Sequence, residues 1–222
     1  MLKVGLTGGI ASGKSVVGEM LVGLGAHLVQ ADRIAHQLML PGQPVYNEVV
    51  RHFGGAILNP DLSVNRGRLA AAAFGSATSG AEDKLSAARP ALPSRVQELN
   101  RIVHPAVLRS QAEWMEEMGR QDPRAIAIVE AALILEAGAA KGFDRLIVVT
   151  CSDEQRVARF AARQSLDLDA ARKEVERRMA AQLPEAEKIK AADYVIDNSG
   201  SLDHTREQVR QLWEQLRAQQ PP

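Results

Sequence analysis

The feature that most constrains this chain is a glycine-rich turn between two regular patterns near residue 10. Residues 3–7 form a short apolar run, residues 8–13 hold three glycines, and residues 14–24 carry apolar side chains at helical spacing. The spacing predicts a strand, a turn and a helix. Within this stretch, Gly8, Gly13, Lys14 and Ser15 stand in the pattern G-x-x-x-x-G-K-S. In a strand-to-helix context this is the Walker A pattern.

The Walker A residue types suit the binding of a nucleotide's phosphates. Glycines leave the turn free of side chains, so that backbone N–H groups can wrap a phosphate at the positive end of the following helix. Lys14 is expected to reach the β- and γ-phosphates, and the Ser15 hydroxyl is expected to bind Mg²⁺. The predicted nucleotide contacts are Gly9, Ile10, Ala11, Ser12, Gly13, Lys14, Ser15 and Val16.

The rest of the chain alternates strand patterns with helical patterns. Four further strands are predicted at residues 26–31, 125–130, 144–150 and 192–197. Helices are predicted at residues 33–39, 44–53, 66–74, 94–118, within 155–190, and at 202–218. Strands that alternate with helices predict a three-layer α/β fold with a five-stranded parallel sheet. Residues 75–93 show no period and are expected to form an irregular loop.

Composition restricts the possible partners. A length of 222 residues suits one domain, and 27 basic residues balance 27 acidic ones. Balanced charge and an aromatic content of 4% argue against nucleic-acid binding. The sequence has no apolar run long enough to span a membrane and no leader pattern, and its single Cys151 excludes an internal disulfide. We expect a cytoplasmic protein without a membrane or nucleic-acid partner, either a monomer or a weak homo-oligomer.

Two acids follow predicted strands at the edge where parallel sheets bind ligands. Asp32 comes after the second strand and is a candidate general base, although an Asp directly before a helix also serves as an N-cap. Glu130 ends the apolar run at 125–129, as a Walker B acid does, and would orient Mg²⁺ across from Ser15.

The basic segment that follows Ser152 suggests a lid. Arg159 and Arg163 are four residues apart and share a helix face. They either clamp phosphate or lie on a solvated surface, and Arg suits phosphate because its planar fork meets two oxygens at once. His104 precedes Pro105, which is expected to kink or divide the helix at 94–118. His104 either caps carbonyls there or meets a substrate.

Among Walker A proteins, the sequence favours a small-molecule kinase. The guanine motif N-K-x-D of GTPases is absent, and no repeated unit suggests a ring ATPase. A phosphate loop, an acid after the second strand and a basic helical segment are the parts that such a kinase needs.

The motifs together resemble the dephospho-CoA kinase family over nearly the whole chain. The resemblance rests on Leu6-Thr7-Gly8-Gly9-Ile10-Ala11-Ser12-Gly13-Lys14-Ser15, Ala31-Asp32, His104-Pro105, Leu133 to Glu136, the series Gln155, Arg159 and Arg163, Gln182, and Ala192-Asp193-Tyr194-Val195-Ile196-Asp197-Asn198.

This resemblance implies ATP-dependent phosphorylation of the ribose 3′-hydroxyl of dephospho-CoA, the last step of coenzyme A synthesis. It implies one P-loop kinase domain over residues 1–222, with a helical acceptor-binding segment at about 40–118 and a basic helical lid at about 153–190.

The resemblance also implies site roles. Asp32 would be the base, with Lys14, Arg159 and Arg163 as further catalytic residues. Ser15 and Glu130 would hold the metal. Asn198 would lie against adenine, while His104 and Glu136 would lie near the acceptor.

The sequence departs from the family pattern in four places. Glu130 stands where the family usually has Asp, and Gln30-Ala31-Asp32 stands for D-A-D. The run Ala132-Leu133-Ile134-Leu135-Glu136 stands for P-L-L-x-E, and the stretch at 75–93 is longer than the family's usual connection. A kinase with another nucleoside or nucleotide acceptor and a non-catalytic ATP sensor remain the alternatives.

Overall fold

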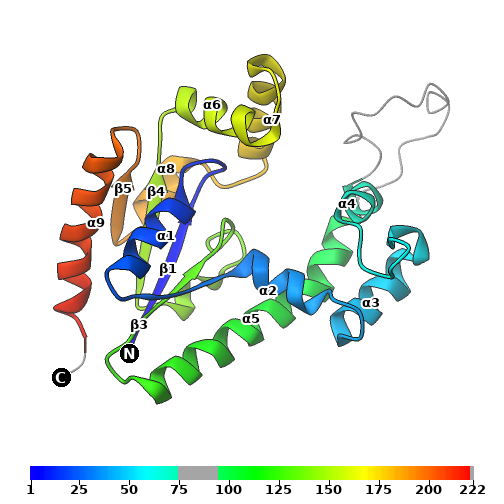
Figure 1. Cartoon of the computed structure of the whole chain (residues 1–222), viewed down its shortest axis with the longest axis horizontal. Coiled ribbons are helices and arrows are strands. Elements are labelled where there is room, and N and C mark those ends of the chain that lie inside the picture. The colour runs from blue at the N-terminus through cyan, green and yellow to red at the C-terminus, as the bar shows by residue number, and fades with distance from the viewer. Residues whose placement is uncertain (75–94, 221–222) are drawn as a thin grey trace. The chain divides into compact units, whose positions relative to one another are not determined.

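The computed structural model describes residues 1–74 and 95–220 and divides into two compact units. One unit contains Met1–Ala31 and Glu113–Pro222, and the other contains Asp32–Ala112 (Figure 1). The irregular stretch predicted at 75–93 and the predicted helix start at 94 lie outside the described residues.

The first unit is built on a parallel sheet of five strands. These are β1 (Leu2–Gly8), β2 (His27–Gln30), β3 (Ile126–Glu130), β4 (Arg145–Thr150) and β5 (Tyr194–Asp197). Their order is β2-β3-β1-β4-β5, and every neighbouring pair is parallel. The predicted five-stranded parallel sheet is confirmed. Since β1 lies between β3 and β4, the end of β1 stands beside the ends of two strands that come more than a hundred residues later.

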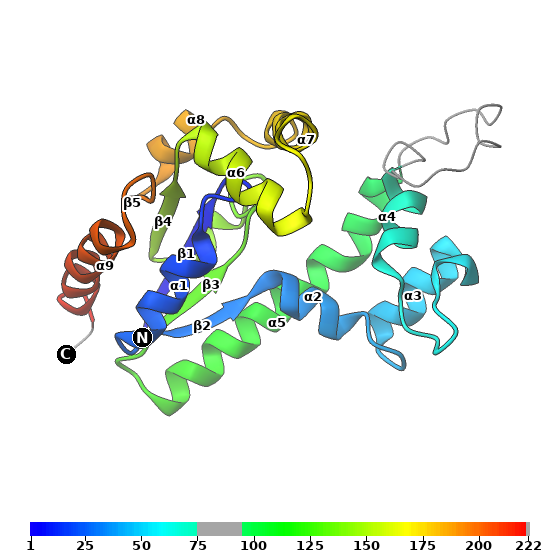
Figure 2. The ribbon, with the colours of Figure 1, turned by 45° about the horizontal axis from the view of Figure 1, so that its top comes forward.

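Helices cover both faces of this sheet, which gives the predicted three layers. On one face lie α1 (Lys14–Gly23) and α9 (Leu202–Arg217) (Figure 2). Their side chains share a core with alternate strand residues. That core contains Val4, Leu6, Val17, Leu21, Ile128, Ile147, Val209, Leu212 and Leu216. On the other face, Met115 near the end of α5 (Val96–Gln121) packs with Ala127 and Val129. Alternate strand residues therefore face opposite layers, as buried parallel strands require.

The second unit is helical; it runs from Asp32 to Ala112 and overlaps the segment predicted to be helical at about 40–118. It contains most of α2 (Ala31–Leu38), then α3 (Pro44–Phe53), the 3₁₀ turn η1 (Gly55–Ile57), α4 (Arg66–Phe74) and the first part of α5. The bounds of α3 and α4 match the prediction. Inside the unit, the Tyr46 hydroxyl donates to the Leu62 carbonyl at 2.7 Å, and the Arg95 guanidinium lies 4.5 Å from the Phe53 ring centroid.

Pro105 does not divide the helix that contains it. α5 is continuous from Val96 to Gln121 with Pro105 inside, so the alternative of two separate helices is wrong. A proline removes one helical hydrogen bond, but Val103, Ala106 and Val107 around it are buried. Their packing holds the helix together through the defect.

The boundary between the second strand and the helix after it lies earlier than predicted. β2 ends at Gln30 and α2 begins at Ala31, so Ala31 lies in the helix rather than in the predicted strand. An acid in the first turn of a helix favours this earlier start, because it faces the positive end of the helix dipole.

The basic segment forms three helices: α6 (Asp153–Gln164), α7 (Leu168–Ala180) and α8 (Glu185–Ala191). Ser165 in the left-handed region ends α6, and Pro184 precedes α8. A short 3₁₀ helix, η3 (Ala139–Gly142), follows the turns after β3.

The shared core makes a stability prediction. Leu216 on α9 is fully buried, whereas Leu202 on the same helix is 54% exposed. Leu216→Ala should lower the free energy of unfolding by ~2–5 kcal/mol, because it leaves a cavity between α9 and the sheet. Leu202→Ala removes the same atoms from the surface and should cost under ~1 kcal/mol. Urea denaturation of both variants measures the difference, and equal losses would show that α9 is not packed as described.

Candidate active site

The glycine-rich turn connects the end of β1 to the start of α1 and has an unusual backbone. Gly8 and Gly13 have φ values of 152° and 94°, and Ala11 has a φ of 53°. A Cβ at Gly8 would lie 2.3 Å from the Val149 carbonyl oxygen, and one at Gly13 would lie 2.0 Å from the Asn198 amide nitrogen. Glycine is therefore required twice over, by backbone angle and by close neighbours.

Lys14 folds back over this turn. Its Nζ donates to the carbonyls of Gly8 and Gly9 at 3.0 and 3.1 Å. The ammonium group thus lies at the loop that it is predicted to serve. Val16, two residues further along α1, has a 38% exposed side chain.

Ser15 and Glu130 meet across the ends of β1 and β3, as the sequence predicted. Ser15 Oγ donates to Glu130 Oε1 at 2.7 Å, and Gln30 Nε2 donates to Glu130 Oε2 at 2.9 Å. Glu130 is 8% exposed and ends β3, paired in register with Leu6 and Gln30. Hydrogen bonds from Ser15 and Gln30 therefore fix the orientation of both carboxylate oxygens. Gln30 was missed from the sequence, since its amide acts only because β2 lies next to β3.

Asn198 supports the turn from behind β5. Its Nδ2 donates to the Ser12 carbonyl at 2.9 Å, and its Oδ1 accepts from Thr205 Oγ1 at 2.9 Å. The Asn198 side chain is 2% exposed and Thr205 is fully buried. The preceding Asp197 accepts from the Ser199 N–H at 2.9 Å, and hydrogen bonding with Ser199 lowers the pKa of the Asp197 carboxyl. These bonds fix the chain where β5 ends.

The two lid arginines chosen from the sequence lie in different surroundings. Arg159 donates to the Ser12 carbonyl at 3.4 Å and to the Asn198 carbonyl at 2.9 Å. Arg163 is exposed, and its guanidinium lies 5.7 Å from the Phe160 ring centroid. The structure brings Arg159 to the loop, whereas it places Arg163 on the outer surface of α6.

Arg156 also contacts the loop, through a shorter hydrogen bond than that of Arg159, and it was not predicted from the sequence. It is fully buried; Nη1 donates to the Ile10 carbonyl at 2.9 Å, and Nη2 donates to Glu185 Oε1 at 2.9 Å. A Cβ at Gly9 would lie 2.3 Å from Arg156 Nη1. The available signal was its spacing, four residues before the buried Phe160, which places it on the apolar face of α6.

The side chains of the loop itself point away from solvent. Ile10 joins an apolar cluster with Val157, Phe160 and other residues of α6 and α7, and Ser12 is fully buried. Cys151 lies at the end of β4 with Sγ 3.8 Å from the Ala11 carbonyl oxygen, and burial raises the pKa of its thiol.

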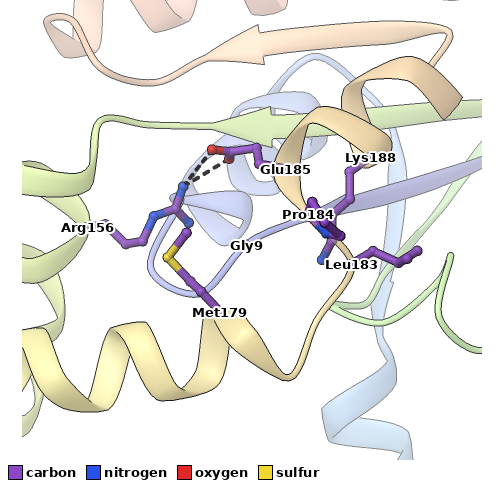
Figure 3. Close-up of a pocket in the computed structure, with 7 residues that line it drawn as sticks. All are labelled: Gly9, Arg156, Met179, Leu183, Pro184, Glu185 and Lys188. Carbon is purple, nitrogen blue, oxygen red and sulfur yellow. Dashed lines mark hydrogen bonds and ion pairs between the residues drawn. The ribbon is translucent and has the colours of Figure 1, made fainter.

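A small pocket of about 50 Å³ lies beside Gly9 and is shown in Figure 3. Its lining includes Arg156, Glu185 and Lys188. Lys188 is 2% exposed and pairs with Glu136 Oε1 at 2.8 Å, as Arg156 pairs with Glu185. Both buried cations are thus neutralised, so the pocket has no excess positive charge that would favour an anion.

Asp32 and His104 both belong to the second unit. Asp32 lies two residues after β2, in the first turn of α2, and its carboxylate accepts no hydrogen bond from any residue in 1–74 or 95–220. Among the described residues, the Asp32 side chain therefore makes no hydrogen bond that would cap a helix. His104 lies in α5 with a half-buried side chain.

Comparisons with known proteins, like the geometry of the loop, indicate a kinase. The sequence model of the dephospho-CoA kinase family matches residues 2–204. The chain belongs to the dephospho-CoA kinase family. It is 38% identical over 213 residues to the dephospho-CoA kinase of Corynebacterium jeikeium, covering 96% of this chain and 98% of that one.

Solved structures share the fold of this chain. The protein TT1252 from Thermus thermophilus superposes with a TM-score of 0.73 at 30% identity, with 97% of each chain covered. Shikimate kinase from Bacteroides thetaiotaomicron superposes with a TM-score of 0.53 at 13% identity, covering 97% of this chain and 98% of that one, which shows the shared fold alone. The predicted P-loop kinase fold and the predicted family are confirmed.

The described residues offer neither a membrane-spanning helix nor a ready-made metal cluster. Across residues 1–74 and 95–220, each helix is too short or too polar to cross a membrane. The same residues hold no group of three or more His, Cys, Asp or Glu side chains that could bind a metal ion by themselves.

The two ends of α1 provide a matched test of the loop. Gly13→Ala would force a Cβ against Asn198 at a positive φ, so we expect ATP affinity to fall by about tenfold or more. Gly23 ends the same helix, and a Cβ there would meet no other atom of the described chain within 4 Å, so Gly23→Ala should leave affinity unchanged. Titration calorimetry with ATP compares them. Equal affinities would show that the loop tolerates the added methyl group.

Proposed function

We propose that this chain transfers the γ-phosphoryl group of ATP to the ribose 3′-hydroxyl of dephospho-CoA, the last step of coenzyme A synthesis. The observation that carries the proposal is the Ser15–Glu130 hydrogen bond of 2.7 Å at the start of α1, beside the glycine-rich loop. Membership of the dephospho-CoA kinase family supports the choice of acceptor. Phosphoryl transfer needs mainly positioning and charge neutralisation, and the residues below are assigned to those tasks.

The loop and Lys14 would hold the phosphates of ATP. The backbone N–H groups between Gly9 and Val16 lie around the N-terminus of α1, which carries the partial positive charge of the helix dipole. The Lys14 ammonium, which lies at the carbonyls of Gly8 and Gly9, would move to the β- and γ-phosphate oxygens when they are present. Asn198 is proposed to lie near the adenine through the backbone of its turn, because its side-chain amide is committed to Ser12 and Thr205.

Ser15 and Glu130 would hold Mg²⁺. A hydroxyl and a carboxylate are oxygen ligands of the kind that Mg²⁺ prefers, and this ion usually takes few protein ligands because it keeps water and phosphate oxygens. Glu130 has the reach of one more methylene than Asp, and Gln30 holds its Oε2 in place. When bound, the ion would neutralise charge on the β- and γ-phosphate oxygens.

Asp32 would act as the general base. Its place after β2 puts it on the chain that leaves the carboxyl edge of the sheet, where α/β proteins bind ligands. The ribose 3′-oxygen would attack the γ-phosphorus while its proton passes to the Asp32 carboxylate. The bond from that phosphorus to the bridging oxygen would break, and ADP would leave.

Arginines and acceptor contacts would complete the site. Arg159 is proposed to neutralise the transferred phosphoryl group, and Arg163 to reach it from the lid at 153–190. His104 and Glu136 are proposed to lie near the acceptor. Glu136 Oε2 is buried without a hydrogen-bond partner among the described residues, so it is the oxygen left to accept from a substrate hydroxyl. The small soluble substrates suit the cytoplasmic, monomeric or weakly associating protein predicted from the sequence.

The direct test is a coupled ADP-release assay with Mg-ATP. Dephospho-CoA, adenosine, AMP and no acceptor are compared, and the product is weighed by mass spectrometry. We expect ADP only with dephospho-CoA, a product heavier by one phosphoryl group, and loss of turnover when EDTA removes the metal. Another preferred acceptor would refute the assignment within the kinases, and ATP binding without turnover would favour a nucleotide sensor.

The role of Asp32 makes a separate prediction. Asp32→Asn should keep ATP affinity and lower kcat by ~10²–10⁴, the usual contribution of a general base. Asp203→Asn is the matched control, because Asp203 also stands in the first turn of a helix, α9, but its side chain is exposed to solvent. Steady-state kinetics measures kcat for both variants. A kcat of Asp32→Asn near the wild-type value would rule out Asp32 as the general base.

A further inference from the structure

Two carbonyls of the phosphate loop are held by buried side chains from distant parts of the chain. Arg156 Nη1 donates to the Ile10 carbonyl at 2.9 Å, and Asn198 Nδ2 donates to the Ser12 carbonyl at 2.9 Å. Between these carbonyls lies Ala11, whose φ of 53° places it in the left-handed region that side chains disfavour. The loop therefore keeps a strained shape while both of its flanks are anchored.

Anchoring a carbonyl also orients the next N–H. In a trans peptide unit the C=O and the following N–H lie in one plane and point in opposite directions. Since the Ser12 carbonyl points at Asn198, the Gly13 N–H points to the opposite side of the loop. The same argument applies to the Ile10 carbonyl and the Ala11 N–H. The two anchors thus set the direction of two of the amides that a phosphate would meet.

The Asn198 amide is itself oriented by Thr205 on α9. Thr205 Oγ1 donates to Asn198 Oδ1 at 2.9 Å, and the same hydroxyl lies farther, at 3.3 Å, from the Ser201 carbonyl. If the amide turned over, its oxygen would face the Ser12 carbonyl oxygen, and two acceptors would meet. Both side chains are at least 98% buried, where such a mismatch is costly. The Thr205 hydroxyl can donate to Oδ1 only while Nδ2 faces the Ser12 carbonyl, so Thr205 favours the orientation in which Asn198 holds the loop.

We propose that Thr205 is a positioning residue for the phosphates of ATP, acting through Asn198 on the Ser12–Gly13 peptide. The inference rests on the proposed function for the identity of the ligand. Thr205 is fully buried on α9 and is not itself a ligand-binding residue. Its hydroxyl prepares the loop before the nucleotide arrives, so that less of the binding free energy is spent on ordering the loop.

The test compares Thr205→Val with Thr205→Ser. Valine keeps the shape of threonine and removes the hydroxyl, whereas serine keeps the hydroxyl and removes the methyl group. We expect Thr205→Val to raise the Kd and KM for ATP roughly tenfold, the factor that one ordinary hydrogen bond carries, and to leave the KM for dephospho-CoA unchanged. Thr205→Ser should restore ATP affinity to within about twofold of the wild type. In the nucleotide-free protein, hydrogen exchange should increase in the loop with Val and stay low with Ser.

Leu216→Ala controls for a general loss of stability, because it weakens the same helix without touching Asn198. It should leave the Kd for ATP unchanged at a temperature where the protein is folded. An unchanged Kd in Thr205→Val would overturn the proposal, as would equal losses in the Val and Ser variants or an equal loss in Leu216→Ala.

Asn198→Asp provides a second route if Thr205→Val does not fold. It keeps the size of the side chain and turns the donor toward Ser12 into a carboxylate oxygen, which should raise the Kd for ATP by about tenfold or more. Unchanged affinity in this variant would overturn the proposal. A wild-type chain that binds ATP but does not phosphorylate dephospho-CoA would refute the proposed function and leave these affinity comparisons valid.

Discussion

A parallel sheet gathers the carboxyl ends of its strands on one edge, and the site of this protein depends on that constraint. β1 lies between β3 and β4, so Gly8 at the end of β1 pairs with Val149, and Leu6 pairs with Glu130. The Ser15–Glu130 hydrogen bond therefore joins two residues that are 115 positions apart in the sequence. The order of the strands brings the site residues together, so the local sequence needs only to place the appropriate residue at the end of each strand.

The loop could be predicted from the sequence because its requirements are local. Gly8 and Gly13 have backbone angles that favour glycine, and Lys14 and Ser15 begin the following helix, so a local pattern is sufficient to recognise all four. Glu130 was also predictable, since an apolar run that ends in an acid follows from the same logic. The helices α3 and α4 matched their predicted bounds because Pro44 and Phe74 stand at clear changes of pattern.

The supports of the loop could not be predicted in the same way. Arg156, Gln30 and Thr205 act on residues that are distant in sequence, and their roles follow from strand order and helix packing. Single-residue composition gives no signal for such contacts. Arg156 is instructive, because a charged residue on the apolar face of a helix is unfavourable unless it is paired, and its pairing with Glu185 appears only when α8 is placed. The catalytic role proposed for Asp32 has a different basis. It rests on the place of Asp32 after β2 in the chain and on membership of the family.

The separation between the loop and Asn198 has a consequence for how the protein is made. The Asn198–Ser12 hydrogen bond joins residues that are 186 positions apart. During synthesis the ribosome finishes the phosphate loop long before it adds the side chains that hold the loop in shape. A nascent chain that ends before residue 198 contains the whole Walker A pattern but lacks the Asn198 and Thr205 anchor. If this anchor positions the loop as proposed, full nucleotide affinity would develop only after translation has passed α9, so the motif would appear before its function.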